Sequence, residues 1–248
     1  MSKIKVSAVS YTNTLPFLQG IKASPKILEQ IDLSVDVPAE CARKVIQNEA
    51  DLGIIPVAAL TKILDYHIVT DYCIGSDGAV DSVFIFSTKP IAQIRSLRLD
   101  SQSRTSNGLA RILLKHHWKL DVEVVIEGEA DAYVLIGDRT FGQKDIVPYV
   151  YDLGEIWKDF TGLPFAYAVW VSNKKLPEDF ISDFNMALRE GVSHPLDVVP
   201  GLPSYSNFDY KIYLTENLDF NLDNRKREAI SKYLKLYESL EEIDFKGV

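Results

Sequence analysis

The chain of 248 residues contains little sulfur, with only two cysteines and two methionines. Cys41 and Cys73 are too few for the disulfide framework of a small secreted domain, and they do not stand at a metal-ligand spacing. The four histidines show no metal spacing either; they are His67, His116, His117 and His194. We therefore expect two reduced, buried cysteines that serve as packing residues, and no metal site.

Long hydrophobic runs and an excess of positive charge are also missing. No segment approaches the roughly 18 apolar residues of a membrane helix, and the first residues, Met-Ser-Lys-Ile-Lys-Val, lack the apolar stretch of a signal peptide. The formal net charge of -8 argues against nucleic acid or an anionic membrane surface as a partner. These absences predict a cytoplasmic protein without membrane insertion, and they leave its oligomeric state open.

Three common cofactor and catalytic signatures are absent as well. The sequence has no phosphate-loop lysine, no dinucleotide-binding glycine fingerprint and no Gly-x-Ser-x-Gly nucleophile elbow. We therefore expect no cofactor, and we expect a small-molecule ligand that is recognised by ordinary polar side chains.

What the chain does contain is an alternation of short apolar runs with helical patterns, which is typical of βαβ units and a mostly parallel sheet. Its 46% of hydrophobic residues is enough for a sizeable core. Pro38 and Pro56 suit the first turns of two helices. The predicted strands cover residues 4–9, 33–37, 52–55, 83–87, 97–99, 122–126 and 132–136, and the predicted helices cover residues 105–117 and 176–190, the latter ended by Gly191, with others around Trp157 and after the N-cap Asp223.

Two crossings between lobes are expected. The apolar run of residues 165–171 is followed by a polar turn, where we place the return crossing, and the first crossing is placed near residue 88. Residues 1–88 and 173–248 would then form a discontinuous first lobe, and residues 89–172 would form the second. Two crossings make a hinge, so the sequence predicts an α/β, two-lobed solute-binding architecture with a ligand cleft between the lobes.

Four polar loops follow or precede strand-like runs, at the places where loops of α/β proteins face a binding crevice. They carry hydroxyls and one amide rather than metal ligands. The clearest is Ser103-Arg104-Thr105-Ser106 at a helix start, because unpaired N–H groups and the helix dipole favour an anion such as a carboxylate there. The alternative is that Ser103 only caps the helix and that Arg104 points to water.

The other polar loops have structural alternatives too. Asn13 can bind a ligand or make local backbone hydrogen bonds in its turn, and Ser82 can bond to a neighbouring backbone group. Asp138 can pair with the arginine beside it, cap a turn or accept from a ligand hydroxyl, and the sequence does not rank these roles. Tyr167, in an apolar run, is expected in the core rather than at a ligand.

Six segments stand in a characteristic order along the chain. They are Val9-Ser10-Tyr11-Thr12-Asn13-Thr14-Leu15-Pro16, Asp51-Leu52-Gly53-Ile54-Ile55-Pro56-Val57-Ala58, Asp81-Ser82-Val83, Ser103-Arg104-Thr105-Ser106, Ile136-Gly137-Asp138 and Thr161-Gly162-Leu163-Pro164-Phe165-Ala166-Tyr167-Ala168-Val169-Trp170. In this order they closely resemble the chorismate dehydratase family of the futalosine route to menaquinone. One departure is Thr12, where an apolar residue such as Leu is expected. The match covers roughly residues 4–172, and the tail from Leu176 adds no site motif.

The resemblance implies a two-lobed periplasmic-binding-protein-like (type II) fold. It also implies a hydro-lyase that removes water from chorismate to give 3-[(1-carboxyvinyl)oxy]benzoate. Asn13 and Ser82 would then hold and polarise groups at the reacting centre as catalytic residues. The residues implied to bind the substrate are Ser10, Tyr11, Thr12, Ser103, Arg104, Thr105, Ser106, Gly137 and Asp138.

The proton acceptor is the open question in this chemistry, because the matched segments contain no His, Lys or Glu. One hypothesis is that the protein orients and desolvates the substrate, and that the substrate's own enolpyruvyl carboxylate takes the proton. The rival hypothesis makes Asp138 a general base.

Two other functions remain as alternatives. The related 1,4-dihydroxy-6-naphthoate synthase of the same pathway and fold looks to carry a His where this chain has Gly137-Asp138, which favours the dehydratase. A non-catalytic cytoplasmic sensor or binding protein for a small carboxylate could use the same cleft, because a fold alone does not fix the function.

Overall fold

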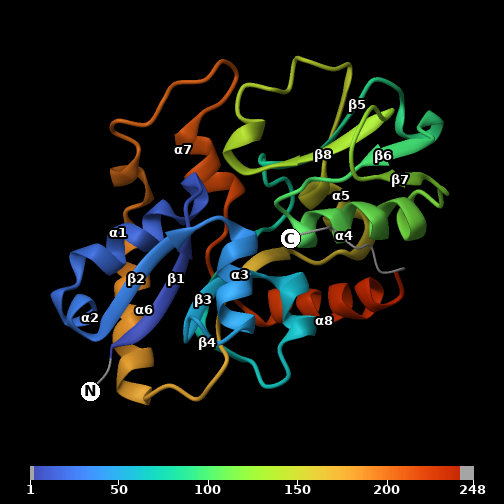
Figure 1. The fold of residues 1–248 in the computed structure, drawn as a ribbon. Coiled ribbons are helices and arrows are strands. Elements are labelled where there is room, and N and C mark those ends of the chain that lie inside the picture. The colour runs from blue at the N-terminus through green and yellow to red at the C-terminus, as the bar shows by residue number, and fades with distance from the viewer. Residues whose placement is uncertain (1–2, 241–248) are drawn as a thin grey trace.

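The computed structural model describes residues 3–240, which form two five-stranded sheets with helices packed around them. Figure 1 shows strands β1 to β4 in one part of the molecule and strands β5 to β8 in another. The chain therefore has the two-lobed α/β architecture that the sequence predicted.

The first sheet has the strand order β2-β1-β3-β10-β4. Strand β1 pairs in parallel with β2 and β3, whereas β10 runs antiparallel to its neighbours β3 and β4. All five residues of β3 are buried, as expected of a central strand with a continuous apolar sequence. The strands are β1 (Ile4–Val9), β2 (Ile31–Asp36), β3 (Leu52–Pro56), β4 (His67–Ser76) and β10 (Phe165–Ser172).

The second sheet has the strand order β7-β6-β8-β5-β9. Strand β6 pairs in parallel with β7 and β8, and β5 runs antiparallel to β8 and β9. The strands are β5 (Val83–Ser87), β6 (Ser96–Arg98), β7 (Glu123–Val125), β8 (Ala132–Ile136) and β9 (Tyr149–Asp152). Strands β4 and β9 were not among the strands predicted from the sequence.

The two sheets have the same strand arrangement, and this arrangement corrects the points at which the chain was expected to cross between the lobes. Strand β10 lies antiparallel between β3 and β4, and β5 lies in the same way between β8 and β9. Residues 83–87 therefore belong to the second sheet and residues 165–172 to the first, the reverse of the expectation. An almost entirely apolar strand can be buried in either sheet. Only its pairing with neighbouring strands shows to which sheet it belongs. We propose that the lobes divide within residues 77–82 and 162–164.

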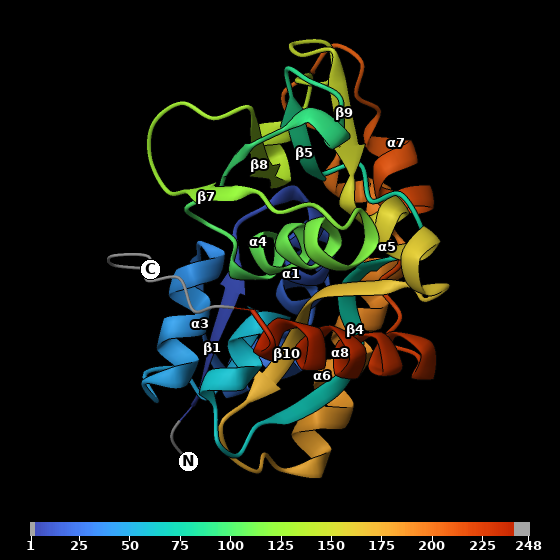
Figure 2. The same ribbon diagram turned by 90° about the vertical axis from the view of Figure 1, so that its right-hand side faces the viewer.

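Helices cover the sheets and agree with most of the predicted positions. Trp157 lies in α5, and Asp223 caps α8 by accepting a hydrogen bond from the backbone N–H of Lys226 at 2.8 Å. Figure 2 shows α8 beside α4 and β10, so the C-terminal helix contacts both lobes. The helices are α1 (Leu15–Ala23), α2 (Pro25–Gln30), α3 (Pro38–Ile46), α4 (Arg104–Ile112), α5 (Leu153–Thr161), α6 (Glu178–Ser193), α7 (Tyr210–Ile212) and α8 (Asn224–Glu238), with 3-10 turns at 12–14, 57–62, 91–93, 137–140 and 195–198 and π-helical turns at 113–117 and 213–217.

Helices α1 and α6 touch backbone to backbone. A Cβ atom added to Gly20 would lie 2.0 Å from the carbonyl oxygen of Ala187, and one added to Gly191 would lie 1.9 Å from that of Pro16. Gly191 therefore lies inside α6 instead of ending it, because the helix contact requires the missing side chain. This contact fixes α1, which begins directly after the polar turn of residues 10–14.

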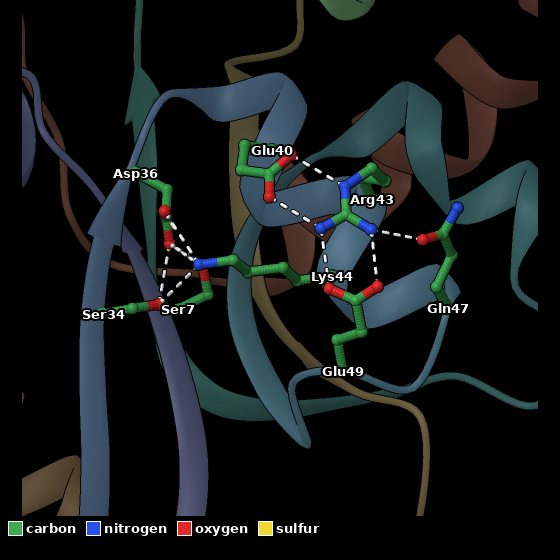
Figure 3. A network of polar contacts seen from close by, with 8 residues as sticks. All are labelled: Ser7, Ser34, Asp36, Glu40, Arg43, Lys44, Gln47 and Glu49. Atoms are coloured by element: carbon green, nitrogen blue, oxygen red, sulfur yellow. Dashed lines mark hydrogen bonds and ion pairs between the residues drawn. The ribbon is translucent and has the colours of Figure 1, made fainter.

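The carboxylate of Asp36 ties together the elements on the other side of β1 (Figure 3). It accepts hydrogen bonds from the hydroxyls of Ser7 (2.8 Å) and Ser34 (2.7 Å) and from the ammonium of Lys44 (2.7 Å). Burial raises the pKa of Asp36, but these hydrogen bonds outweigh it and the net shift is downward. The backbone carbonyl of Asp36 also accepts from the N–H of Ser10 at 2.9 Å, which holds the start of the polar turn.

The two cysteines have the packing role that was expected. Cys41 and Cys73 are buried and unpaired, and burial raises the pKa of both thiols to about 12. A thiol with so high a pKa is a poor nucleophile at neutral pH. Among residues 3–240, no helix has both the length and the apolar character that a membrane span requires.

The contact between α1 and α6 gives a test of the fold. Gly20→Ala should lower the free energy of unfolding by roughly 1–3 kcal/mol, because the new methyl group has no space against the α6 backbone. Urea denaturation of the variant measures this. Lys22→Ala, an exposed change on the same helix, is the matched control and should alter stability by less than about 0.5 kcal/mol. Equal stability of Gly20→Ala and the control would contradict the packing.

Candidate functional site

A cavity lies between the two lobes and encloses about 580 Å³, counting the space at its open mouth. Its walls are mostly apolar, with a small number of polar groups, as is usual in small-molecule sites. The apolar lining residues are Val9, Pro38, Ile54, Pro56, Ile74, Val80, Val83, Ile136, Gly137 and Ala168. The polar lining residues are Tyr11, Asn13, Thr14, Ser82, Ser103, Thr105, Ser106 and Tyr167.

Most of the residues predicted for the site meet at this cavity. Seven of them line it, and they come from both lobes: Tyr11, Asn13, Ser82, Ser103, Thr105, Ser106 and Gly137. Four do not line it: Ser10, Thr12, Arg104 and Asp138. The lining contains no Lys, Arg, His, Asp or Glu, and residues 3–240 contain no cluster of His, Cys, Asp or Glu suited to a metal ion.

The N-terminus of α4 faces the cavity. The hydroxyl of Ser103 accepts a hydrogen bond from the backbone N–H of Ser106 (3.1 Å) and donates to the Ser106 hydroxyl (2.9 Å). The hydroxyl of Thr105 accepts from the backbone N–H of Ala58 in the first lobe at 3.2 Å. Ser103 therefore caps the helix and lines the cavity at once, so the two roles considered from the sequence are compatible. The positive end of the helix dipole favours an anionic group at this wall.

Ser82 is positioned by the crossing between the lobes. The buried carboxylate of Asp152 accepts hydrogen bonds from the backbone N–H groups of Val80 (3.0 Å), Asp81 (2.8 Å) and Gly154 (2.8 Å). One side chain thus fixes the segment that leads into β5 and the first turn of α5. Ser82 directly follows this segment, and its backbone carbonyl accepts a hydrogen bond from the N–H of Gly137 at 2.8 Å.

Asn13 and Ser82 are joined by a residue that the sequence analysis missed. The hydroxyl of Tyr213 donates a hydrogen bond to the hydroxyl of Ser82 at 3.0 Å, and the side chain of Asn13 lies beside the same phenol and lowers its pKa. Tyr213 is fully buried, and burial raises its pKa, so the hydroxyl stays protonated as a donor. Thr14 donates to Oδ1 of Asn13 at 3.1 Å, which leaves the amide N–H groups of Asn13 to act as donors.

Nothing in the sequence pattern singles out Tyr213. It lies 131 residues after Ser82 and belongs to the tail in which no site motif was found. Tyr167 was also missed, because it was expected only in the core; it is 8% exposed, and it lines the cavity as well as packing there.

Asp138 contacts the turn after β1, while Arg139 beside it pairs with Asp100 instead. Its carboxylate accepts from the backbone N–H of Thr12 (3.0 and 3.2 Å) and from the hydroxyl of Thr12 (2.9 Å). Burial raises the pKa of Asp138, and the hydrogen bonds from Thr12 offset this only in part. The carboxylate thus holds the turn after β1 against the second lobe. It also gives a structural reason for a threonine where an apolar residue was expected.

Tyr11 makes a second contact between the lobes. Its hydroxyl is hydrogen bonded to Gln102 and to Arg139, and the guanidinium of Arg139 contacts both carboxylate oxygens of Asp100, at 2.9 and 2.7 Å. Gly137 has a positive φ of 61°, and a Cβ atom there would lie 2.8 Å from the Tyr11 ring. A larger residue at position 137 would therefore displace Tyr11 from the cavity wall.

Solved structures of low sequence identity share this fold. Protein AF1704 of Archaeoglobus fulgidus matches with a TM-score of 0.72 and 16% identity, over 96% of this chain and 97% of that one. The alkanesulfonate-binding protein SsuA of Xanthomonas axonopodis pv. citri, bound to MOPS, matches with a TM-score of 0.66 and 11% identity, over 96% of this chain and 93% of that one. The Candida albicans CA3427 gene product is described as having the generic periplasmic binding protein fold. It matches with a TM-score of 0.62 and 15% identity, over 98% of this chain and 92% of that one. The predicted periplasmic-binding-protein-like fold is confirmed.

Sequence comparison points to a pathway. A chorismate dehydratase of Thermus thermophilus is 24% identical over 218 residues, which cover 76% of this chain and 77% of that protein. The model of a family described as "Menaquinone biosynthesis" matches residues 4–239, which include the cavity, its polar turns and Tyr213. The chain therefore belongs to the menaquinone biosynthesis family.

Proposed function

We propose that this protein is a chorismate dehydratase, which removes water from chorismate to give 3-[(1-carboxyvinyl)oxy]benzoate in the cytoplasm. The observation that carries the proposal is the meeting of Asn13 and Ser82, from opposite lobes, at one cavity whose far wall is the N-terminus of α4. Membership of the menaquinone biosynthesis family and the similarity to a named chorismate dehydratase support it.

The cavity suits the groups that chorismate carries. Chorismate has two carboxylates and a ring hydroxyl, and the helix start at Ser103 to Ser106 offers hydroxyls and a positive dipole for one carboxylate. The dipole contributes only about 0.3–1 kcal/mol, so most of the affinity must come from hydrogen bonds and the apolar walls. Among the described residues no Lys or Arg lines the cavity, so we expect the second carboxylate to bind without a cationic partner there.

The uncharged lining supports the hypothesis of substrate-assisted elimination. In that mechanism the enolpyruvyl carboxylate takes the proton from ring C3, the C3–H electron pair forms a ring double bond, and the C4–O bond breaks. The C4 hydroxide receives the proton that the carboxylate took from C3, so the oxygen departs as water and the carboxylate is restored. The ring becomes aromatic, which supplies the driving force. Asn13 and Ser82 donate hydrogen bonds to the departing hydroxyl, and the mostly apolar walls of the cavity keep the carboxylate poorly solvated and hence basic.

Asp138 is poorly placed to be the base. Its carboxylate accepts from the backbone N–H and the hydroxyl of Thr12, and it does not line the cavity. A general base needs hydrogen-bond reach to the proton that it removes. We therefore assign Asp138 the role of holding the turn that carries Asn13.

Incubation of the purified protein with chorismate tests the function. We expect loss of one water and a new aromatic product, followed by mass and ultraviolet absorbance, and Asn13→Ala and Ser82→Ala should each lower kcat by about 10²–10³-fold. Ser231→Ala, an exposed change on α8, is the matched control and should keep wild-type activity. Chorismate that binds and is recovered intact would favour a sensor, and turnover of the naphthoate synthase substrate alone would favour that enzyme.

Replacement of Asp138, the base in the rival hypothesis, separates the two mechanisms. Asp138→Asn should keep kcat within about tenfold of wild type, because the amide oxygen still accepts from Thr12 and no proton transfer depends on it. Steady-state kinetics with chorismate measures this, with Asp121→Asn, an exposed loop change, as the control. A loss of about 10²-fold or more in kcat would assign Asp138 as the base instead.

A further inference from the structure

Tyr213 stands behind the two residues assigned to the reaction. It does not line the cavity, yet its hydroxyl donates a hydrogen bond to Ser82 and lies beside the side chain of Asn13. Asn13 lies in the first lobe and Ser82 leads into the second sheet, so one phenol joins the two sides of the cleft at the reacting centre.

The Tyr213 ring is held rigidly by its surroundings. It belongs to an aromatic segment, residues 205–213, that packs on Phe141 of the second lobe. Phe208 stacks on Phe141 with ring centroids 3.7 Å apart, and the Tyr213 ring packs edge-on against Phe141 at 5.3 Å. Asp209 caps the turn before it by accepting from the N–H of Lys211 at 2.7 Å.

Tyr213 begins a π-helical turn, residues 213–217. Such turns are rare and occur often at functional sites. The extra residue in the turn places the phenol against Ser82, whereas the residue before it, Ile212, is 46% exposed.

The direction of these hydrogen bonds matters for the chemistry. Because Tyr213 donates to Ser82, the Ser82 oxygen is an acceptor here, and its own hydrogen remains available. This hydrogen is donated to the carbonyl of Val80 at 3.5 Å, which is long for a hydroxyl hydrogen bond, so a ligand oxygen at shorter distance can take it. Thr14 donates to Oδ1 of Asn13, so the amide N–H groups are what Asn13 offers to a ligand. Both side chains are thereby set as donors to a group in the cavity.

We propose that Tyr213 is a positioning residue that holds Ser82 and Asn13 as a matched pair of hydrogen-bond donors for the departing hydroxyl of the substrate. This inference rests on the proposed dehydratase function. It deepens that function by adding a residue from the C-terminal tail to the site.

Removal of one hydroxyl tests the proposal. Tyr213→Phe keeps the ring packing and should lower kcat for chorismate by about tenfold, with KM changed by less than about twofold, because substrate contacts remain and only donor orientation is lost. Tyr210→Phe is the matched control: it lies in the same segment, its hydroxyl donates to the carbonyl of Pro203 at 2.8 Å, and it should leave kcat and KM at wild-type values.

A double-mutant cycle separates positioning from general support of the fold. If Tyr213 acts through Ser82, Tyr213→Phe should cost much less in a Ser82→Ala background than in the wild type. An equal loss in both backgrounds, or a wild-type kcat for Tyr213→Phe, would overturn the proposal. Wild-type protein that leaves chorismate unchanged would overturn the dehydratase function itself, and this inference with it.

A second substitution covers the case in which Tyr213→Phe does not fold. Incorporation of 3,5-difluorotyrosine at position 213 keeps the ring and the hydroxyl, but this phenol ionises at lower pH. The alkaline limb of the kcat profile should move to lower pH, because the ionised phenol no longer donates to Ser82. A profile that matches wild type would count against the assignment.

Discussion

The carboxylate of Asp138 holds the turn after β1 against the second lobe by accepting three hydrogen bonds from Thr12. This turn carries Tyr11 and Asn13, and its position decides whether they face the cavity. The other contacts across the cleft depend on the same placement, because the Tyr11 ring packs on Gly137 and the Asn13 amide meets Tyr213 only when the turn is in this position. The site is therefore a product of lobe contact and belongs to neither lobe alone.

The cavity also illustrates how a site can act on an anion without a cation. A lysine or arginine in the lining would pair with a carboxylate and lower its basicity. Neutral donors at the start of α4 bind a carboxylate more weakly than a cation would, but they leave the second carboxylate of the substrate basic. The guanidinium of Arg139, which acts on Tyr11 of the polar turn, is paired with the buried carboxylate of Asp100. The electrostatics of the site thus fit a reaction in which the substrate supplies its own base.

Local sequence signals were sufficient for most of the strands and for seven of the residues that line the cavity. Ser103 precedes an amphipathic helix, and Asn13 and Ser82 flank apolar strands, so their places at loop ends could be predicted. The contacts of Asp138 and Tyr213 could not, because they join residues 126 and 131 positions apart with no pattern linking them. Strand β4 was not predicted because it begins with exposed residues and its sequence does not alternate regularly between apolar and polar residues. The sheet membership of β5 and β10 depends on pairing, and local composition carries no information about it.

The exchange of strands between the lobes has a consequence for how the chain is made. Strand β4, ten residues long, has its ladder with β10, which follows it by almost ninety positions. During synthesis the first sheet therefore has an open edge until the whole second lobe and α5 have left the ribosome. Unpaired strands of this kind are prone to wrong pairing with other chains. That edge stays exposed until the second lobe has formed and β10 can pair with β4. Fast folding of the second lobe therefore shortens the period in which the first sheet can mispair.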